Sequence, residues 1–433
     1  MFKKKIYPAP YSKIKNNSDK NTKKRCGVYL DYASTTPTDE RVIKAMAPYF
    51  KEKFGNTMSL HGFGQEAKEA LEKSREGVAN LMGAKASEVI FTSSATESNN
   101  LALKGIALAR RSPCLAGAPA KRVGGGGHVI ISSIEHACVM ESAKWLENQG
   151  FEITRLKVDQ YGLVNPDDVR KAIKKETILV SIIHANNEIG TIQPIREIGE
   201  VIRKKSEILN LKSKIYFHTD AAQSFGKIPI DVNKMNIDLL TASSHKMYGP
   251  KGAALLFVKS GTKIEPLLHG GGHEFGLRSS TVNVPAIVGF AEACRICQKE
   301  LRQESKRLSI LRDKLIKGVL SKIGGAHLNG HPKKRLPNNV NFSFDFIEGE
   351  SLVIQLDLLG VAASTGSACS SVTLEPSHVL LAIGLKPEQA HGSLRLSLGR
   401  WTKEKDIDYV LEVLPKIIKR LREISPFKKS FKF

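Results

Sequence analysis

The sequence predicts an α/β fold, with a large domain built on a mostly parallel sheet that helices cover on both faces, followed by a smaller α+β domain. Between residues 89 and 258, short apolar runs alternate with amphipathic helical stretches, a pattern typical of βαβ units. Polar clusters follow five of these apolar runs, at the strand ends where open α/β sheets bind ligands. The 433 residues suffice for two or three domains with a large core.

The chain divides into four stretches by composition and pattern. Residues 1–27 are polar, rich in lysine and nearly free of acids, and we expect a disordered or targeting extension. Residues 28–60 are predicted to form an N-terminal arm that packs with the small domain. Residues 61–263 form the predicted large domain, in which the low-complexity stretch 112–127 is a flexible insertion. Residues 264–433 form the small domain, which opens with a long helix.

The net charge of +23 is concentrated at the two ends of the chain. Residues 1–26 carry a net +8 and residues 416–433 a net +6. This distribution favours a solvated or targeting tail and the charged face of a last helix over an arm that binds nucleic acid. With 41% hydrophobic and 25% charged residues, the composition is that of an ordinary globular protein. No apolar run approaches the roughly 18 residues that a membrane-spanning helix needs, so no membrane association is expected.

The six cysteines do not resemble a disulfide framework, because the chain is long and has no clear secretory signal. We therefore expect a reducing compartment. Cys294 and Cys297 form a C-x-x-C pair within a helix-like stretch. A structural zinc site usually has four ligands, and no second pair is present, so packing is the favoured interpretation.

The strongest functional signal is Lys246, within the run SSHKMYGP that follows a predicted strand at residues 237–242. A lysine held among hydroxyl and imidazole groups can stay partly unprotonated, which is the state that forms a Schiff base. Asp220, at the end of the preceding strand, is suited to stabilise a pyridinium nitrogen. Together they indicate pyridoxal phosphate, whereas a lysine beside a Gly-Pro turn taken alone is more often a solvated loop residue.

A second signal lies where the apolar run EVIFT passes into a helical stretch. The sequence SATES at this point offers free backbone amides and the Thr96 hydroxyl, which together form a seat for a phosphate group. Simple N-capping of the helix is the alternative interpretation.

Seven longer motifs extend these signals over the chain: ATESNN, IEHACV, NNEIG, TDAAQSFGK, SSHKMYGPKG, HGGGHEFGLRSST and STGSACSS. In their order and spacing they resemble the cysteine desulfurase family, in its housekeeping iron-sulfur branch, and the resemblance covers about residues 28–426. It implies a fold-type I pyridoxal phosphate enzyme related to the class V aminotransferases, with a seven-stranded sheet. Such an enzyme removes sulfur from L-cysteine, leaves L-alanine and carries the sulfur as a persulfide on Cys369.

The resemblance also implies a role for each matching residue. Lys246 would form the Schiff base and His136 would stack on the cofactor ring and move protons, while Arg395 and Asn187 would bind the substrate. Arginine is suited to a bidentate bond with the substrate carboxylate. The residues implied to bind the cofactor are Ala95, Thr96, Asn187, Asp220, Gln223, Ser243, His245 and Lys246, with Thr281 supplied by the partner subunit of a homodimer.

Cys369 lies in the small polar run SACSS, which can move without steric cost. A thiolate is a strong nucleophile, so it can accept the substrate sulfur. The resemblance further implies delivery of sulfur to an iron-sulfur scaffold protein with accessory factors, a use in tRNA thiolation, and Cys369 as a transient iron-sulfur ligand shared with the scaffold. The implied compartment is the mitochondrial matrix or a mitochondrion-derived organelle, with a bacterial cytoplasm as the alternative.

The chain departs from the family pattern at three places. Ser244 stands where a glycine is usual before the His-Lys pair, and Thr57-Met58 replace the usual residues of the arm. The family's tail, which helps to dock the scaffold, continues beyond the match to Ser425-Pro426, which leaves docking through that tail open.

Two other functions fit parts of the sequence. A selenocysteine lyase or an aminotransferase would keep the fold and the cofactor, but an aminotransferase needs no reactive thiol such as Cys369. A basic RNA-binding protein on a retired enzyme fold would explain the charge. The intact set of Lys246, Asp220, Gln223 and His136 argues against it, and no stable binding of nucleic acid is expected.

Overall fold

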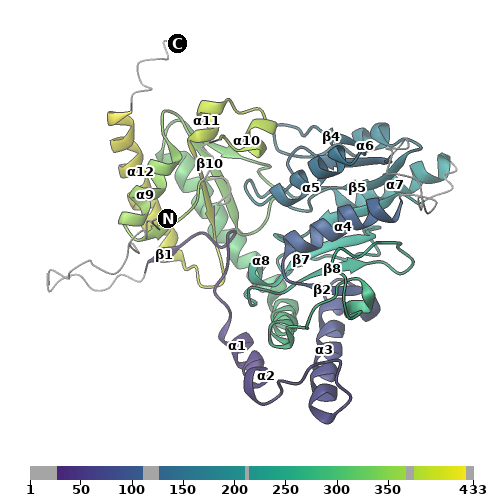
Figure 1. Cartoon of the computed structure of the whole chain (residues 1–433). Helices are drawn as coiled ribbons and strands as arrows, with labels where there is room; N and C mark the ends of the chain where they lie inside the picture. Colours follow the sequence, from purple (N-terminus) through teal and green to yellow (C-terminus); the bar gives the residue numbers. More distant parts are fainter. Residues whose placement is uncertain (1–26, 111–125, 210–213, 367–374, 426–433) are drawn as a thin grey trace, which may run out of the picture.

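The computed structural model describes residues 27–110, 126–209, 214–366 and 375–425 (Figure 1). Most of the predicted extension and insertion, the last eight residues and Cys369 lie outside the described residues. The described part consists of a large sheet with its helices and a smaller unit that contains the C-terminal helix.

The large unit contains a seven-stranded sheet, which confirms the predicted α/β class. β8 runs antiparallel to both of its neighbours, and the remaining pairs are parallel. In sheet order the strands are β2 (Val89–Thr92), β8 (Ala254–Val258), β7 (Leu239–Ser243), β6 (Tyr216–Asp220), β5 (Thr177–Ser181), β3 (His128–Ser132) and β4 (Glu152–Leu156). Six of them are buried at every position, because helices cover both faces, and β4 is partly exposed.

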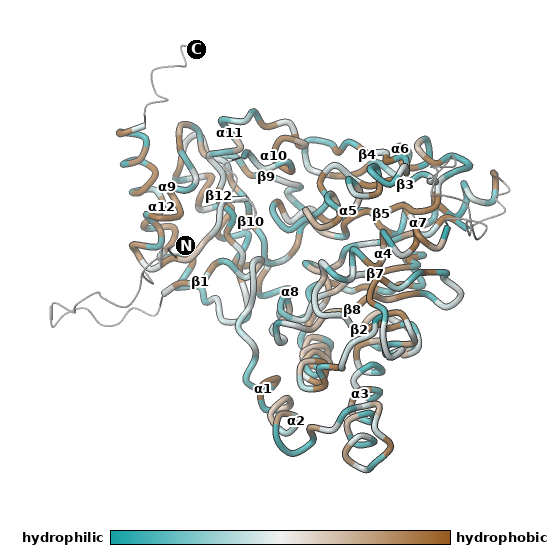
Figure 2. Tube along the Cα trace, in the orientation of Figure 1, coloured by the Kyte–Doolittle hydropathy of each residue, from teal (hydrophilic) through white to brown (hydrophobic). Residues whose placement is uncertain are grey.

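Successive residues of one strand contribute to different cores. Val129 and Ile131 of β3 pack in the cluster that contains α4 and α5, whereas Ile130 packs in the cluster that contains α3, α6 and α7. This follows from the two-residue period of a strand. In Figure 2 the hydrophobic colour follows the strands of this sheet. The helices of the large unit are α3 (Gly62–Asn80), α4 (Ala95–Ala109), α5 (Ala137–Asn148), α6 (Pro166–Ala172) and α7 (Ile195–Ile208), with a short η1 (Ala86–Glu88).

The smaller unit is built on a three-stranded antiparallel sheet in the order β12-β10-β9. Its apolar core joins β10 and β12 to α9 and α12. The elements are β9 (Ala326–Asn329), β10 (Asn339–Phe344), α9 (Gly349–Leu358), β11 (Val361–Ala362), α10 (His378–Ala382), α11 (Pro387–His391), β12 (Ser393–Ser397) and α12 (Glu404–Ile424).

One long helix, α8 (Val284–Lys322), belongs to both units. Phe290 and its neighbours pack in the core of the large unit, and Leu315 packs in the core of the smaller one. Cys294 and Cys297 are buried in the first half of α8 among apolar side chains, as the packing interpretation predicted. Among the described residues, no group of three or more His, Cys, Asp or Glu side chains is arranged to hold a metal ion.

The N-terminal stretch runs along the boundary between the two units. β1 (Val28–Tyr29) pairs in parallel with β11, and Asp31 forms a bridge with Ser397. Two short helices follow, α1 (Glu40–Met46) and α2 (Pro48–Lys51), which lie against α8 (Figure 1). None of the helices in the described part of the chain is long and apolar enough to cross a membrane.

Candidate active site

The predicted site residues gather at one edge of the large sheet. Asp220 is the last residue of β6 and Ser243 is the last residue of β7, and these strands are parallel neighbours. His136 follows β3 after a short turn, and Asn187 follows β5. Because the carboxyl ends of parallel strands meet at the same edge, residues that lie far apart in the sequence come together here.

The Asp220 carboxylate is buried, and uncharged groups hold it. The Asn99 side-chain amide donates a hydrogen bond of 2.7 Å to Oδ2, and the backbone N–H of Ala222 donates one of 2.9 Å to Oδ1. A buried carboxylate is expensive unless a cation compensates it. The protonated ring nitrogen of pyridoxal phosphate would supply that charge, so Asp220 fits the implied cofactor.

Lys246 ends the short helix η2 (Ser244–Lys246) that follows β7. Its Nζ donates to two backbone carbonyls of the N-terminal stretch, those of Ala33 at 2.7 Å and Ser34 at 2.6 Å. The Gln223 side-chain amide donates to the same Ala33 carbonyl at 2.8 Å. Lys246 and Gln223 therefore donate to the same Ala33 carbonyl. The family resemblance assigns both residues to the cofactor.

A second lysine, Lys227, contacts Gln223, and no role was predicted for it from the sequence. Lys227 is buried, and its Nζ donates to the Gln223 carbonyl at 2.9 Å and lies 3.5 Å from Gln223 Oε1. Burial, and then the charge of Lys246, lowers the pKa of Lys227 to about 7. The signal was present in the sequence, because Lys227 closes the motif TDAAQSFGK four residues after the glutamine.

Around Lys246 the remaining predicted residues are buried or half-buried. Burial and the nearby charge of Lys246 lower the pKa of His245 to about 4, so this imidazole is neutral at pH 7. Its Nδ1 lies 3.1 Å from the Thr35 hydroxyl. The unusual Ser244 is fully buried against Gly249, where a Cβ atom would lie 2.0 Å from the Ser244 hydroxyl oxygen. A glycine at 249 thus makes room for the serine.

The predicted phosphate seat is the start of α4. Ser94 caps this helix, since its hydroxyl accepts a hydrogen bond from the Glu97 N–H at 3.2 Å. Capping does not exclude the predicted phosphate seat, because Ala95 and Thr96 follow the cap and Thr96 is exposed. Glu97 pairs with Arg278 at 2.8 Å, which ties the loop that leads to the exposed Thr281 to the same helix.

His136 is the N-cap residue of α5. Its Nδ1 accepts a hydrogen bond of 3.2 Å from the backbone N–H of Cys138 and lies 3.0 Å from the Cys138 sulfur. His136, Cys138 and Thr96 also line a groove of about 580 Å³ between α4 and α5. The sequence reasoning assigned Cys138 no role.

Arg395 enters the site from β12 of the smaller unit and is only 2% exposed, so its side chain points inward. NH1 donates to the Asn187 carbonyl at 3.0 Å, and NH2 donates to Asp31 at 3.0 Å and to the Ser34 hydroxyl at 2.8 Å. Within the described residues its Nε has no hydrogen-bond partner. A buried donor without an acceptor is costly, so this edge of the guanidinium is suited to a ligand carboxylate.

Cys369 lies within residues 367–374, outside the described residues, but both flanks of that segment are described. Glu188, next to Asn187, is buried and accepts a hydrogen bond of 2.5 Å from the Ser377 hydroxyl. On the other flank, a Cβ atom added at Gly366 would lie 2.6 Å from the same Glu188 carboxylate oxygen. Glu188 therefore contacts both ends of the segment that carries Cys369.

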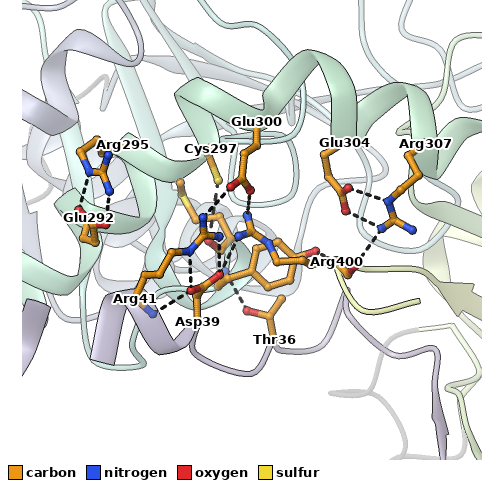
Figure 3. Close-up of polar contacts among 12 residues, drawn as sticks. Thr36, Asp39, Arg41, Glu292, Arg295, Cys297, Glu300, Glu304, Arg307 and Arg400 are labelled. Carbon is orange, nitrogen blue, oxygen red and sulfur yellow. Dashed lines mark hydrogen bonds and ion pairs between the residues drawn. The ribbon is translucent and has the colours of Figure 1, made fainter. Parts of the chain in front are cut away.

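A network of ion pairs lies next to the segment that follows Lys246 (Figure 3). Arg400 bonds Asp39 at 2.7 Å and Glu300 of α8 at 3.0 Å, and Arg41 bonds the same two carboxylates. The Arg400 guanidinium also lies over the ring of Tyr248, two residues after Lys246. Because these partners come from the N-terminal stretch, α8 and the segment after β12, the network joins three distant parts of the chain.

Comparisons with known proteins show which family the chain resembles over most of its length. The aminotransferase class-V family model matches residues 28–410. A cysteine desulfurase IscS of Dictyoglomus turgidum is 50% identical, with 94% of this chain and 98% of that protein covered. A mitochondrial cysteine desulfurase of Arthroderma benhamiae is 46% identical over 92% of this chain and 76% of its own length.

Among solved structures, a NifS-like protein superposes with a TM-score of 0.82 at 38% identity, covering 91% of this chain and 100% of that one. A structure of SspA in complex with cysteine superposes with a TM-score of 0.73 at 36% identity, covering 86% of this chain and 98% of that one. The strand-end lysine and aspartate, the inward arginine and these similarities lead to one conclusion: this chain belongs to the class-V aminotransferase family and, within it, to the cysteine desulfurases.

Proposed function

We propose that this protein takes the sulfur atom from L-cysteine and places it on Cys369, releasing L-alanine. The observation that carries the proposal is the meeting of Lys246, Asp220 and Arg395 at one sheet edge, with a lysine and a carboxylate for the cofactor beside an inward guanidinium for the substrate. The SspA structure in complex with cysteine supports this choice of substrate.

The cofactor of this enzyme is pyridoxal phosphate, as in its family. When bound, it withdraws electrons from the α-carbon of an amino acid, which weakens the bonds around that carbon. We propose that Lys246 carries it covalently, Asp220 pairs with its ring nitrogen and Gln223 bonds its ring hydroxyl. The residues proposed to hold its phosphate group are Ala95, Thr96, Ser243 and His245, with Thr281 of the partner subunit.

Arg395 would bind the carboxylate of cysteine. Its NH1 and NH2 are already held by Asn187, Asp31 and Ser34, so the guanidinium plane is fixed before the substrate arrives. A fixed plane lowers the entropy cost of a bidentate bond. Asn187 supplies its backbone carbonyl to this arrangement and is proposed to contact both cofactor and substrate.

His136 would move protons between the substrate and the site. The Cys138 backbone N–H bonds Nδ1, which leaves Nε2 as the nitrogen that exchanges a proton. His245 contributes no charge, because its lowered pKa keeps it neutral at pH 7. These assignments give the two histidines different tasks, one in proton transfer and one in binding.

The Cys369 thiolate would attack the sulfur of the bound cysteine. The carbon–sulfur bond breaks, a sulfur–sulfur bond forms on Cys369, and a proton replaces sulfur on the substrate carbon, so that cysteine and thiol become alanine and persulfide without an external oxidant. The persulfide is the form proposed to pass to an iron-sulfur scaffold protein with its accessory factors, and to serve as a transient ligand there.

A homodimer completes the proposal. The residues around α2 and the start of α3 expose several large apolar side chains, an unusual feature for a surface that faces only water. The exposed side chains are Phe50, Phe54, Met58, Leu60 and Phe63. The rings of Phe54 and Phe63 stack at 5.6 Å. A second subunit on this surface would bury them.

For location we propose the mitochondrial matrix or a mitochondrion-derived organelle, with a bacterial cytoplasm as the alternative, since both kinds of relative are found.

The test measures alanine released from L-cysteine and persulfide formed on the protein. Lys246→Ala is expected to lose both activities together with the visible absorption of the bound cofactor. Cys369→Ser is expected to keep that absorption and to lose persulfide formation. Cys294→Ala removes a buried thiol of α8 and serves as the control, with activity unchanged. Full sulfur transfer by Cys369→Ser would contradict the proposal.

A further inference from the structure

Four side chains form a continuous line of hydrogen bonds across the site. Asn99 of α4 uses its amide nitrogen twice, donating to Asp220 Oδ2 at 2.7 Å and to the Cys138 sulfur at 3.1 Å. The Cys138 sulfur in turn lies 3.0 Å from His136 Nδ1. Asn99 and Asp220 are buried, and Cys138 and His136 are half-buried. The line thus connects the two residues that would contact opposite parts of the cofactor.

The direction of each hydrogen bond follows from the two ends of the line. At one end, the Asp220 carboxylate accepts the Asn99 N–H, so the amide group of Asn99 faces it with nitrogen. At the other end, the backbone N–H of Cys138 points at His136 Nδ1, at 3.2 Å, and a backbone N–H only donates. His136 Nδ1 is therefore an acceptor and carries no proton.

The directions of the two hydrogen bonds at the Cys138 sulfur then follow. Because Nδ1 is an acceptor, the Cys138 thiol can only donate to it, sharing the one lone pair of Nδ1 with the backbone N–H, and the sulfur accepts the second N–H of Asn99. The thiol is well placed for this, since Cys138 is the second residue of α5 and His136 is the cap of the same helix. The imidazole proton consequently resides on Nε2.

We propose that Cys138 is a positioning residue that holds the His136 ring with its proton on Nε2 and ties that ring, through Asn99, to the carboxylate of Asp220. The inference rests on the proposed function in one respect, that His136 exchanges protons with the substrate. It assigns the second thiol of the site a role as a hydrogen-bond donor, distinct from the sulfur-accepting role proposed for Cys369. Cys138 stays a thiol in this arrangement and takes up no sulfur.

The first test reads the tautomer directly and needs no activity. The full-length protein is labelled with nitrogen-15 histidine, and the His136 ring signals are assigned by their absence from the His136→Gln variant. In the unaltered protein and in Cys138→Ser, Nδ1 is expected to show the shift of an unprotonated nitrogen and Nε2 that of a protonated one. In Cys138→Ala the backbone N–H of residue 138 remains, so Nδ1 is expected to stay unprotonated, but its signal is expected to move because the thiol donor is lost. A protonated Nδ1 in the unaltered protein, or identical shifts in Cys138→Ala, overturns the proposal.

The second test measures alanine formation. One net hydrogen bond corresponds to a change of about 3- to 10-fold, so Cys138→Ala is expected to lower kcat by that factor with KM for cysteine unchanged. Cys138→Ser should restore kcat to within about twofold, because a hydroxyl also donates to Nδ1. Cys294→Ala, which removes a thiol buried in α8, should leave kcat unaltered. An unchanged kcat in Cys138→Ala overturns the proposal, and if the protein releases no alanine at all, the proposed function fails while the tautomer measurement still decides the role of Cys138.

Discussion

Lys246 and Arg395 are both anchored by the same short stretch of the N-terminal arm, but in different ways. The arm holds Lys246 through backbone oxygens, the carbonyls of Ala33 and Ser34. It holds Arg395 through side chains, the carboxylate of Asp31 and the hydroxyl of Ser34. Ser34 takes part in both, with its carbonyl on the lysine and its hydroxyl on the arginine.

Because of this difference, the contacts of Lys246 and those of Arg395 should respond differently to substitutions in the N-terminal arm. A backbone carbonyl persists whatever side chain its residue carries, so the lysine anchor is insensitive to most changes in the arm. The arginine anchor depends on the chemistry of residues 31 and 34. We therefore expect side-chain changes in the arm to alter substrate binding, while the absorption of the cofactor on Lys246 stays the same.

The largest effect is expected where the substrate itself is held. In Arg395→Lys a compact ammonium replaces the planar fork, and the two-point contact with the carboxylate is lost. A hydrogen bond to a charged group contributes about 1.5–3 kcal/mol, so KM for cysteine should rise about 10- to 100-fold. Steady-state alanine formation measures it, with the visible cofactor spectrum as the control. Loss of the cofactor spectrum with a normal KM would contradict the assignment of Arg395 to the substrate, because the arginine would then bind the cofactor.

Asp31→Asn is expected to show the second-largest effect, on stability. The change removes the charge that compensates the buried Arg395, which costs about 1–3 kcal/mol because the Asp31 side chain is 17% exposed. A carboxylate ligand then replaces the missing charge, so saturating L-alanine should raise the thermal midpoint more in the variant than in the unaltered protein. Equal shifts in both proteins would show that Asp31 does not compensate Arg395.

The parts of the site that the sequence predicted are those with a local signal. Lys246 and Asp220 each follow a buried apolar run, and strand ends of that kind meet at one edge of a parallel sheet. The mostly parallel sheet was predictable for the same reason, since most of its strands are short apolar runs that alternate with helical stretches, whereas the number of seven strands was implied by the family resemblance. The roles assigned to these residues stay predictions.

The contacts between distant segments were not predictable. Arg395 and Asp31 lie 364 positions apart, and nothing near either residue announces the pair. The contacts of Lys227 and Cys138 were equally hard to predict, because a lysine in a turn or a cysteine near a helix start is common, and its partners cannot be read from the sequence. Cys369 was identified from the family resemblance alone and lies outside the described residues.

Ser34→Ala tests the comparison most directly, because it removes the hydroxyl and keeps the carbonyl. The arginine loses one of its anchors, and KM for cysteine should rise about 2- to 5-fold. The lysine loses nothing, so the cofactor spectrum and its dependence on pH should not change. Thr38→Ala is the matched control within the arm, because Thr38 contacts the Gly249 carbonyl only weakly, at 3.5 Å, and should leave KM unaltered. A spectral change in Ser34→Ala would contradict the claim that the Ser34 side chain affects Arg395 and not Lys246.

Lys227→Met should have the smallest effect on activity at pH 8, below about twofold, and a distinct effect on stability. Lys227 is also held by a backbone carbonyl, that of Gln223, and its pKa falls from 10.5 to about 7 on folding. Between these pH values the unfolded chain binds more protons than the folded one, so this residue makes stability rise with pH. Denaturant unfolding at pH 7, 8.5 and 10 should therefore show a steeper rise in the unaltered protein than in Lys227→Met. Equal slopes would mean that Lys227 is charged in the folded state, held by the Gln223 carbonyl as Lys246 is held by the carbonyls of Ala33 and Ser34.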